Sequence, residues 1–374
     1  MASVNLPPES MPIAQTAASR FVGLGWLAAT AGLVGTMLLG TTHASESYAG
    51  MWLVGLPALP FLLLFGRMVE RLTLIGLAAI TLTKSGDMLS QGWRQIVFIA
   101  VFMLFARYLV VRPLVAVLIF MVGQLIYLQR LGEISAVFSV TPTVALLMAA
   151  IGIELQARNE GRRLSGWERA KIGLLSAVSL VFPFIGSGSR TALIAWVAFA
   201  IRRMSLGLLL VALMGAIIVS QIPGLLIVSK LQTGISELTN PVPESGLGIS
   251  MRAIEGLIFL DWWQDVGWIE RLFGSAEMIN MPGEMIGRET DPPFVPHNAL
   301  AGMIFQFGLV GILLIAVYFR ALWRHQAAVA PARFLFFILL IPGFIVTGGF
   351  VTVDYAVLAA IVNGMMIRHG ARRA

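Results

Sequence analysis

The sequence predicts an all-α, polytopic membrane protein with about twelve transmembrane helices, and three observations lead to this prediction. Of the 374 residues, 58% are apolar and only 12% are charged, whereas soluble domains have about 25% charged residues. The mean hydropathy is +0.86. Apolar runs that approach the roughly 20 residues needed to cross a bilayer recur along the chain. We therefore expect a single transmembrane domain, 1–374, with one hydrophilic insertion.

The expected spans are the apolar runs that lie between charged residues and turn residues. They lie near residues 21–40, 51–66, 72–84, 95–110, 113–129, 137–156, 172–186, 190–201, 205–222, 298–319, 334–349 and 354–367. The first run is long enough to remain as a permanent span instead of being a cleaved signal peptide. The hydrophilic segment, residues 223–296, separates the ninth and tenth spans and holds 10 of the 19 acidic residues.

The distribution of basic residues tests this map, because lysine and arginine collect on the cytoplasmic side of membrane proteins. With a cytoplasmic N-terminus, 18 of the 26 basic residues fall in cytoplasmic segments. The outer segments hold Lys84, Arg94, Arg130, Arg190, Lys230, Arg252, Arg271 and Arg288. Both termini are then cytoplasmic, and the 223–296 loop is periplasmic. The net charge of +7 reflects this topology, so no nucleic-acid partner is expected.

The long loop is expected to be partly helical. Residues 250–273 have a helical pattern in which Trp262, Trp263 and Trp268 stand beside acidic residues, and such aromatic residues suit a helix at the membrane interface. Residues 281–296 contain four prolines and should be irregular. The chain has no cysteine, so neither a disulfide nor thiol chemistry is available.

Arg190 is the first candidate functional residue. It stands alone in a tight outer turn, Gly186-Ser187-Gly188-Ser189-Arg190-Thr191, at the start of an apolar run. A guanidinium offers five donors in a fixed fork that suits a phosphate or pyrophosphate. The alternative is an arginine that reaches up to the lipid headgroups.

His297 is the second candidate, and it precedes Asn298 at the mouth of the tenth span. With a reference pKa of about 6.5, an imidazole can take a proton from a sugar hydroxyl near neutral pH. The alternative is a helix-capping or interfacial histidine. Carboxylates in the first two outer loops, Glu46 and Asp87, are the other possible bases. No metal site, cofactor or glycine-rich phosphate loop is indicated.

Several of these motifs, in this order, resemble the superfamily of O-antigen ligases and O-antigen or exopolysaccharide polymerases. The two main pieces are Gly188-Ser189-Arg190-Thr191 opening an apolar helix and His297-Asn298-Ala299-Leu300 running into Gln306-Phe307-Gly308-Leu309-Val310-Gly311. Between them, Met251-Arg252, the tryptophan pair and Phe273-Gly274 resemble the loop of the family. Arg130-Leu131-Gly132 with Phe138 and Pro142 resembles an outer-loop pattern, although Thr143 replaces the expected asparagine. The resemblance covers roughly residues 130–311.

The resemblance implies a glycosyltransferase of the helical GT-C architecture in the bacterial inner membrane, with a periplasmic active site. The donor would be a glycan on undecaprenyl pyrophosphate, with membrane lipids around its tail and no metal or cofactor. Arg190 and Arg252 would bind the donor pyrophosphate, and His297 would act as the catalytic base. Asn298, Ser189 and Arg130 would have supporting roles.

The acceptor decides between two related activities. A ligase transfers the glycan to a lipid A core sugar, which we prefer, and a polymerase transfers it to another lipid-linked repeat unit. A transporter of lipid-linked sugars is the hypothesis from a different class. It is less favoured, because ion-coupled transporters carry ionisable groups near the bilayer midplane, whereas Glu154 and Asp354 lie toward the ends of their spans.

Overall fold

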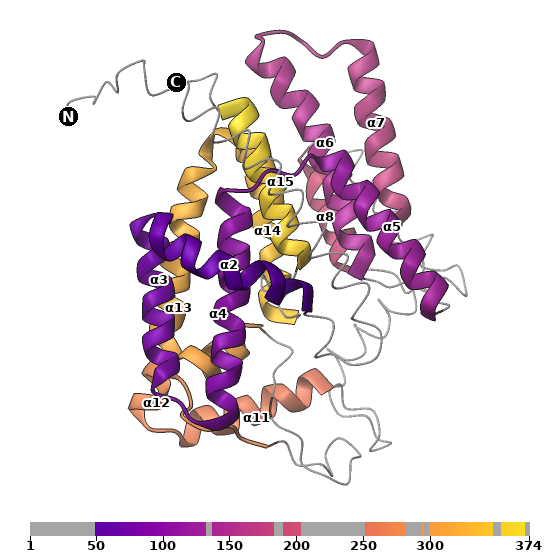
Figure 1. The fold of residues 1–374 in the computed structure, drawn as a ribbon. Helices are drawn as coiled ribbons and strands as arrows, with labels where there is room; N and C mark the ends of the chain where they lie inside the picture. The colour runs from indigo at the N-terminus through magenta and orange to yellow at the C-terminus, as the bar shows by residue number, and fades with distance from the viewer. Residues whose placement is uncertain are drawn as a thin grey trace, which may run out of the picture.

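Every regular element in the described part of this computed structural model is helical (Figure 1). The structure describes residues 49–131, 137–182, 190–202, 251–280, 294, 299–346 and 353–370. These residues form α2 (Ala49–Phe65), α3 (Met68–Leu82), α4 (Gly86–Arg107), α5 (Pro113–Leu131), α6 (Val137–Asn159), α7 (Gly166–Val181), α8 (Arg190–Ile201), α11 (Met251–Asp265), α12 (Trp268–Phe273), α13 (Ala299–His325), the 3₁₀ helix η5 (Ala327–Val329), α14 (Ala330–Val346) and α15 (Val353–Gly370).

Within the described residues, a helix covers each expected span apart from the first and the ninth. Residues 21–40 and 205–222 lie outside the described part of the chain. By length and composition, three of the described helices can cross a membrane: Gly86–Arg107, Val140–Asn159 and Ala299–His325. Shorter apolar helical stretches lie at Gly55–Phe65, Pro113–Val122, Thr191–Ile201 and Ala327–Leu340. The protein is therefore all-helical in these regions and has three candidate membrane spans.

The centre of the structure is formed by α4 and α15, which pack on each other. Residues 96–103 of α4 and 355–362 of α15 are buried on all sides, as expected of helices that are apolar around their whole circumference. The outer helices also carry apolar side chains that point away from the core, among them Leu72, Leu118 and Leu313. An apolar exterior of this extent is typical of a surface that faces lipid.

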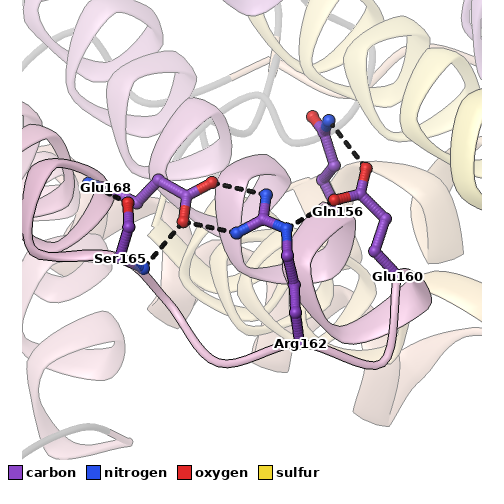
Figure 2. Close-up of polar contacts among 5 residues, drawn as sticks. All are labelled: Gln156, Glu160, Arg162, Ser165 and Glu168. Carbon is purple, nitrogen blue, oxygen red and sulfur yellow. Dashed lines mark hydrogen bonds and ion pairs between the residues drawn. The ribbon is translucent and has the colours of Figure 1, made fainter.

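The start of α7 differs from the expected span, 172–186, because the helix begins at Gly166. Ser165 caps it by accepting a hydrogen bond from the backbone amide of Glu168 (3.2 Å), and the Glu168 carboxylate accepts one from the amide of Ser165 (2.9 Å). Figure 2 shows this capping box beside Arg162. A Ser-x-x-Glu pattern starts a helix before its apolar residues begin, which is why the apolar run alone placed the start too late.

The described helices have two well-separated ends. Figure 1 shows α11 and α12 below α3 and α4, and the turn between α6 and α7 at the top. We call the lower end the loop end and the upper end the opposite end. The expected map assigns residues 67–71, 111–112, 157–171, 320–333 and 368–370 to cytoplasmic segments and places Arg107 on the same side. Contacts at the opposite end join several of these segments, for example Asn159 Nδ2 with the His369 carbonyl (3.1 Å).

A buried ion pair lies at the opposite end. Glu70, in the first turn of α3, is fully buried and accepts hydrogen bonds from the Arg67 amide (2.7 Å), the Tyr108 hydroxyl (2.9 Å) and Arg107 Nη1 (3.3 Å). A buried charge needs such partners, so the pair fixes the start of α3 against the end of α4.

Candidate functional site

The structure places some of the expected site residues at helix starts. Arg190 is the first residue of α8, Arg252 is the second residue of α11, and Arg130 lies in the last turn of α5. The side chains of these three arginines are outside what the structure describes, and Ser189, His297 and Asn298 lie outside the described residues. The expected grouping of Arg190, Arg252 and His297 therefore stays a prediction.

The described part of the long loop forms two helices instead of the single helix expected over 250–273. The first, α11, ends at Asp265, and α12 begins at Trp268. The three tryptophans have different environments: Trp262 is buried, Trp263 is half-buried and Trp268 is 69% exposed. Of the three, Trp268 is the one whose exposure suits the expected interfacial position.

Two glycines join the loop to α13. Gly308 has φ 63° and ψ −168°, and it breaks α13 into two helical segments. Gly274, with φ 83°, ends α12. A Cβ on Gly308 would lie 2.3 Å from the Leu272 carbonyl, and one on Gly274 would lie 2.6 Å from the carbonyl carbon of Gln306. The two backbones therefore meet where no other residue type fits, and Ser275 N donates a hydrogen bond of 2.8 Å to Phe305 O.

The turn between α3 and α4 provides the next contacts at this junction. Lys84 is buried, and its Nζ donates hydrogen bonds to the carbonyls of Phe273 (3.2 Å) and Ser275 (2.6 Å). The next residue, Ser85, donates its amide to the Ala276 carbonyl (3.2 Å). Burial lowers the pKa of Lys84 from 10.5 to about 8, and the charge of Glu270 opposes that shift.

Gln306 joins α13 to the start of α4. Its side chain is 1% exposed, and its Nε2 donates to the Met88 carbonyl at 2.8 Å. A buried amide without a partner would be costly, so this bond fixes the rotation of the first segment of α13. The α3–α4 turn, the 272–276 segment and residues 305–308 form one connected unit, which we call the glycine junction.

An aromatic cluster lies beside the glycine junction. Phe305 makes edge-to-face contacts with Trp262 (ring centroids 5.0 Å apart) and with Phe294 (5.2 Å). Phe294 is fully buried, and its backbone amide donates to the Ile279 carbonyl at 2.8 Å. Phe294 and Ala299 are the described residues on either side of His297, and both are buried. The chain is therefore held in place just before and just after the expected base.

A cavity of about 920 Å³ opens along α11. Its lining includes three carboxylates, Asp261, Asp265 and Glu270, two amides, Gln264 and Asn280, and the ring of Trp262. Asp261 and Asp265 lie one helical turn apart and are both exposed. Ionised carboxylates accept hydrogen bonds and do not donate them, so this wall suits a ligand rich in hydroxyl groups and repels a free phosphate.

Sequence reasoning did not identify Lys84 or Phe294. Lys84 is a basic residue in a short outer turn, the same exception to the charge map that singled out Arg190, and that signal could have revealed it. Phe294 lies in a proline-rich stretch and has no local signal. Among the described residues, no group of three or more His, Cys, Asp or Glu side chains is placed to hold a metal ion.

Comparison with known proteins does not add to these observations. No protein-family model matches the chain, and searches of curated proteins and of solved structures found no significant similarity.

Proposed function

We propose that this protein is an inverting membrane glycosyltransferase of the O-antigen ligase type. In this proposal, the chain has twelve spans and a GT-C architecture in the bacterial inner membrane. It transfers a glycan from undecaprenyl pyrophosphate to a sugar hydroxyl of the lipid A core on the periplasmic face. The observation that carries the proposal is the glycine junction. The resemblance singled out Phe273-Gly274 and the Gln306 to Gly308 stretch, and these two stretches contact each other. The second stretch begins eight residues after Asn298.

The proposed chemistry assigns one role to each residue. His297 removes the proton from the acceptor hydroxyl as the acceptor oxygen bonds to the anomeric carbon. The bond from that carbon to the pyrophosphate oxygen breaks on the opposite face, which inverts the configuration. Negative charge grows on the departing undecaprenyl pyrophosphate, and Arg190 and Arg252 stabilise it, since preorganised cations act most strongly on charge that develops in the transition state.

The cavity along α11 would receive the acceptor. Its carboxylates and amides match the hydroxyl groups of a sugar, and they disfavour the pyrophosphate of the donor. The two substrates would therefore approach from different sides: the donor from the membrane and the acceptor from the water-facing loop.

Transfer assays with separate acceptors test the proposal. Purified protein would be given a lipid-linked glycan with either lipid A core or a second lipid-linked unit as acceptor. Product on the core acceptor alone supports a ligase, and product on the lipid-linked acceptor alone corrects the proposal to a polymerase. Absence of product with both acceptors, together with movement of the donor lipid across vesicle membranes, would favour a transporter.

The assignment of the base has its own test. His297→Ala should abolish transfer and leave donor binding intact, whereas His43→Ala, in the first outer loop of the expected map, should retain activity. If the His297→Ala variant were fully active, the base would have to be sought elsewhere, with Asp87 as the first alternative because it is exposed at the loop end.

A further inference from the structure

A second cavity lies at the opposite end of the molecule, far from the glycine junction. Its volume is about 330 Å³, and it opens between the end of α6, the turn that follows α6, the end of α8 and the start of α14. Its charged lining consists of three arginines, Arg158, Arg162 and Arg202, and one carboxylate, Glu154. Apolar side chains form the rest of the wall. The function proposed above makes no use of this cavity.

Arg162 has its charge satisfied by neighbouring carboxylates. It binds both oxygens of Glu168 at 2.6 Å, and its Nε donates to Glu160 at 2.6 Å (Figure 2). Gln156 holds the other oxygen of Glu160 at 3.0 Å. The hydrogen bonds from Arg162 and from the Ser165 amide hold the pKa of Glu168 at about 2. These contacts hold the turn between α6 and α7 in place at the edge of the cavity. The carboxylates of Glu160 and Glu168 both bind Arg162.

Arg158 and Arg202 are in a different situation. Within the part of the chain that the structure describes, neither side chain forms an ion pair or a hydrogen bond. Arg158 and Arg202 are both exposed at the mouth of the cavity. Partial desolvation lowers the pKa of Arg202, and the positive charge of Arg158 lowers it further. Arg158 and Arg202 therefore line the same cavity and lie close enough for their charges to repel. Glu154 is the carboxylate in the cavity wall, and it has interactions of its own.

We propose that this cavity binds a phosphate-bearing anion between Arg158 and Arg202. A bound phosphate would replace the repulsion between the two guanidinium groups by charge-assisted hydrogen bonds, and the guanidinium fork matches the geometry of phosphate oxygens. The cavity lies where apolar helices end, which is the level of lipid headgroups in a membrane. Basic pockets between membrane helices commonly hold acidic headgroups there. The phosphate is that of an anionic lipid or a free phosphate, and the two sources have the same chemistry at the site.

The test compares the full-length protein with two variants in a zwitterionic detergent. One variant combines Arg158→Gln and Arg202→Gln. The control is Arg163→Gln, which removes an exposed arginine of the same turn that does not line the cavity. Each protein is titrated with phosphatidylglycerol, with phosphatidylcholine and with inorganic phosphate, and the shift in melting temperature gives an apparent affinity.

Phosphatidylglycerol should raise the melting temperature of the wild-type and control proteins, and the double variant should bind it about 25-fold more weakly, or about fivefold for each arginine. If inorganic phosphate alone produces the same arginine-dependent shift, the source is a free phosphate. Equal shifts in the wild type and the double variant would overturn the proposal. Without added anion, the double variant should be at least as stable as the wild type, because the repulsion is gone; a clear loss of stability would assign the arginines a structural role and would also overturn it.

Discussion

Replacing Gly308 by alanine tests how tightly the long loop is joined to α13. The backbone at Gly308 has φ 63° and ψ −168°, a region that is essentially restricted to glycine and costs other residues about 1–3 kcal/mol. The added Cβ would also lie 2.3 Å from the Leu272 carbonyl. That contact is with backbone, so no side-chain rotation can relieve it. The segments must separate, and the 2.8 Å hydrogen bond from Ser275 N to Phe305 O is lost, at about 1 kcal/mol.

These effects together should lower the local stability of the glycine junction by about 3 kcal/mol. Amide hydrogen exchange in residues 268–280 would then be about a hundredfold faster, since local opening governs exchange. Gly256→Ala is the matched control, because a Cβ at Gly256 meets no heavy atom within 4 Å. Mass spectrometry of the exchanging peptides gives the comparison. Exchange in 268–280 within about threefold of the control would refute the proposed steric role of Gly308.

Three further predictions concern the hydrogen bonds of Lys84, the acceptor cavity and the membrane topology. Lys84→Met should detach residues 273–276, because it leaves the buried carbonyl of Ser275 and the part-buried carbonyl of Phe273 without this donor, at about 1–3 kcal/mol. The pKa of Lys84 is about 8 in the folded state and 10.5 in the unfolded state. Between pH 8 and pH 10.5, Lys84 is therefore mostly protonated in the unfolded state and mostly neutral in the folded state. The stability of the wild type relative to this variant should therefore rise from pH 8 to pH 10 in thermal unfolding, and a flat difference would contradict the burial of the amine. Asp261→Asn combined with Asp265→Asn should raise the KM for the sugar acceptor and leave the KM for the donor unchanged, and an equal effect on both would exclude the α11 cavity as the acceptor site. Since the chain has no cysteine, Glu277→Cys and Arg163→Cys can be labelled singly with a membrane-impermeant maleimide. Only the first should react in intact cells, and labelling of both from outside would reject the expected map.

Hydrophobic periodicity and charge distribution predicted the helices well, because both depend on local composition. The runs near 95–110 and 298–319 correspond to α4 and α13, two of the three candidate spans. The start of α7 was placed too late because Ser165 and Glu168 extend the helix into polar sequence. The break at Gly308 could not be read from the sequence, since an isolated glycine in an apolar run is compatible with a continuous helix.

The site was less predictable for a related reason. The resemblance selected Phe273-Gly274 and the Gln306 to Gly308 stretch. The sequence motifs do not predict that these two stretches contact each other. Their contact depends on backbone approach at two positive-φ glycines and on Lys84 from a third segment. Such contacts bring together residues far apart in the chain, which periodicity does not encode.

The break in α13 and the docking of the loop depend on each other. In an unbroken helix the Phe305 carbonyl would accept from the amide four residues later, and a buried carbonyl left unpaired would be costly. Ser275 supplies the missing donor, Lys84 satisfies the Phe273 and Ser275 carbonyls, and Gln306 satisfies Met88. Irregular backbone that is buried is stable only when its polar groups have such partners. The loop is therefore a structural part of the start of α13, and a substitution that detaches the loop should disturb the helix start beside His297 before it disturbs the rest of the bundle.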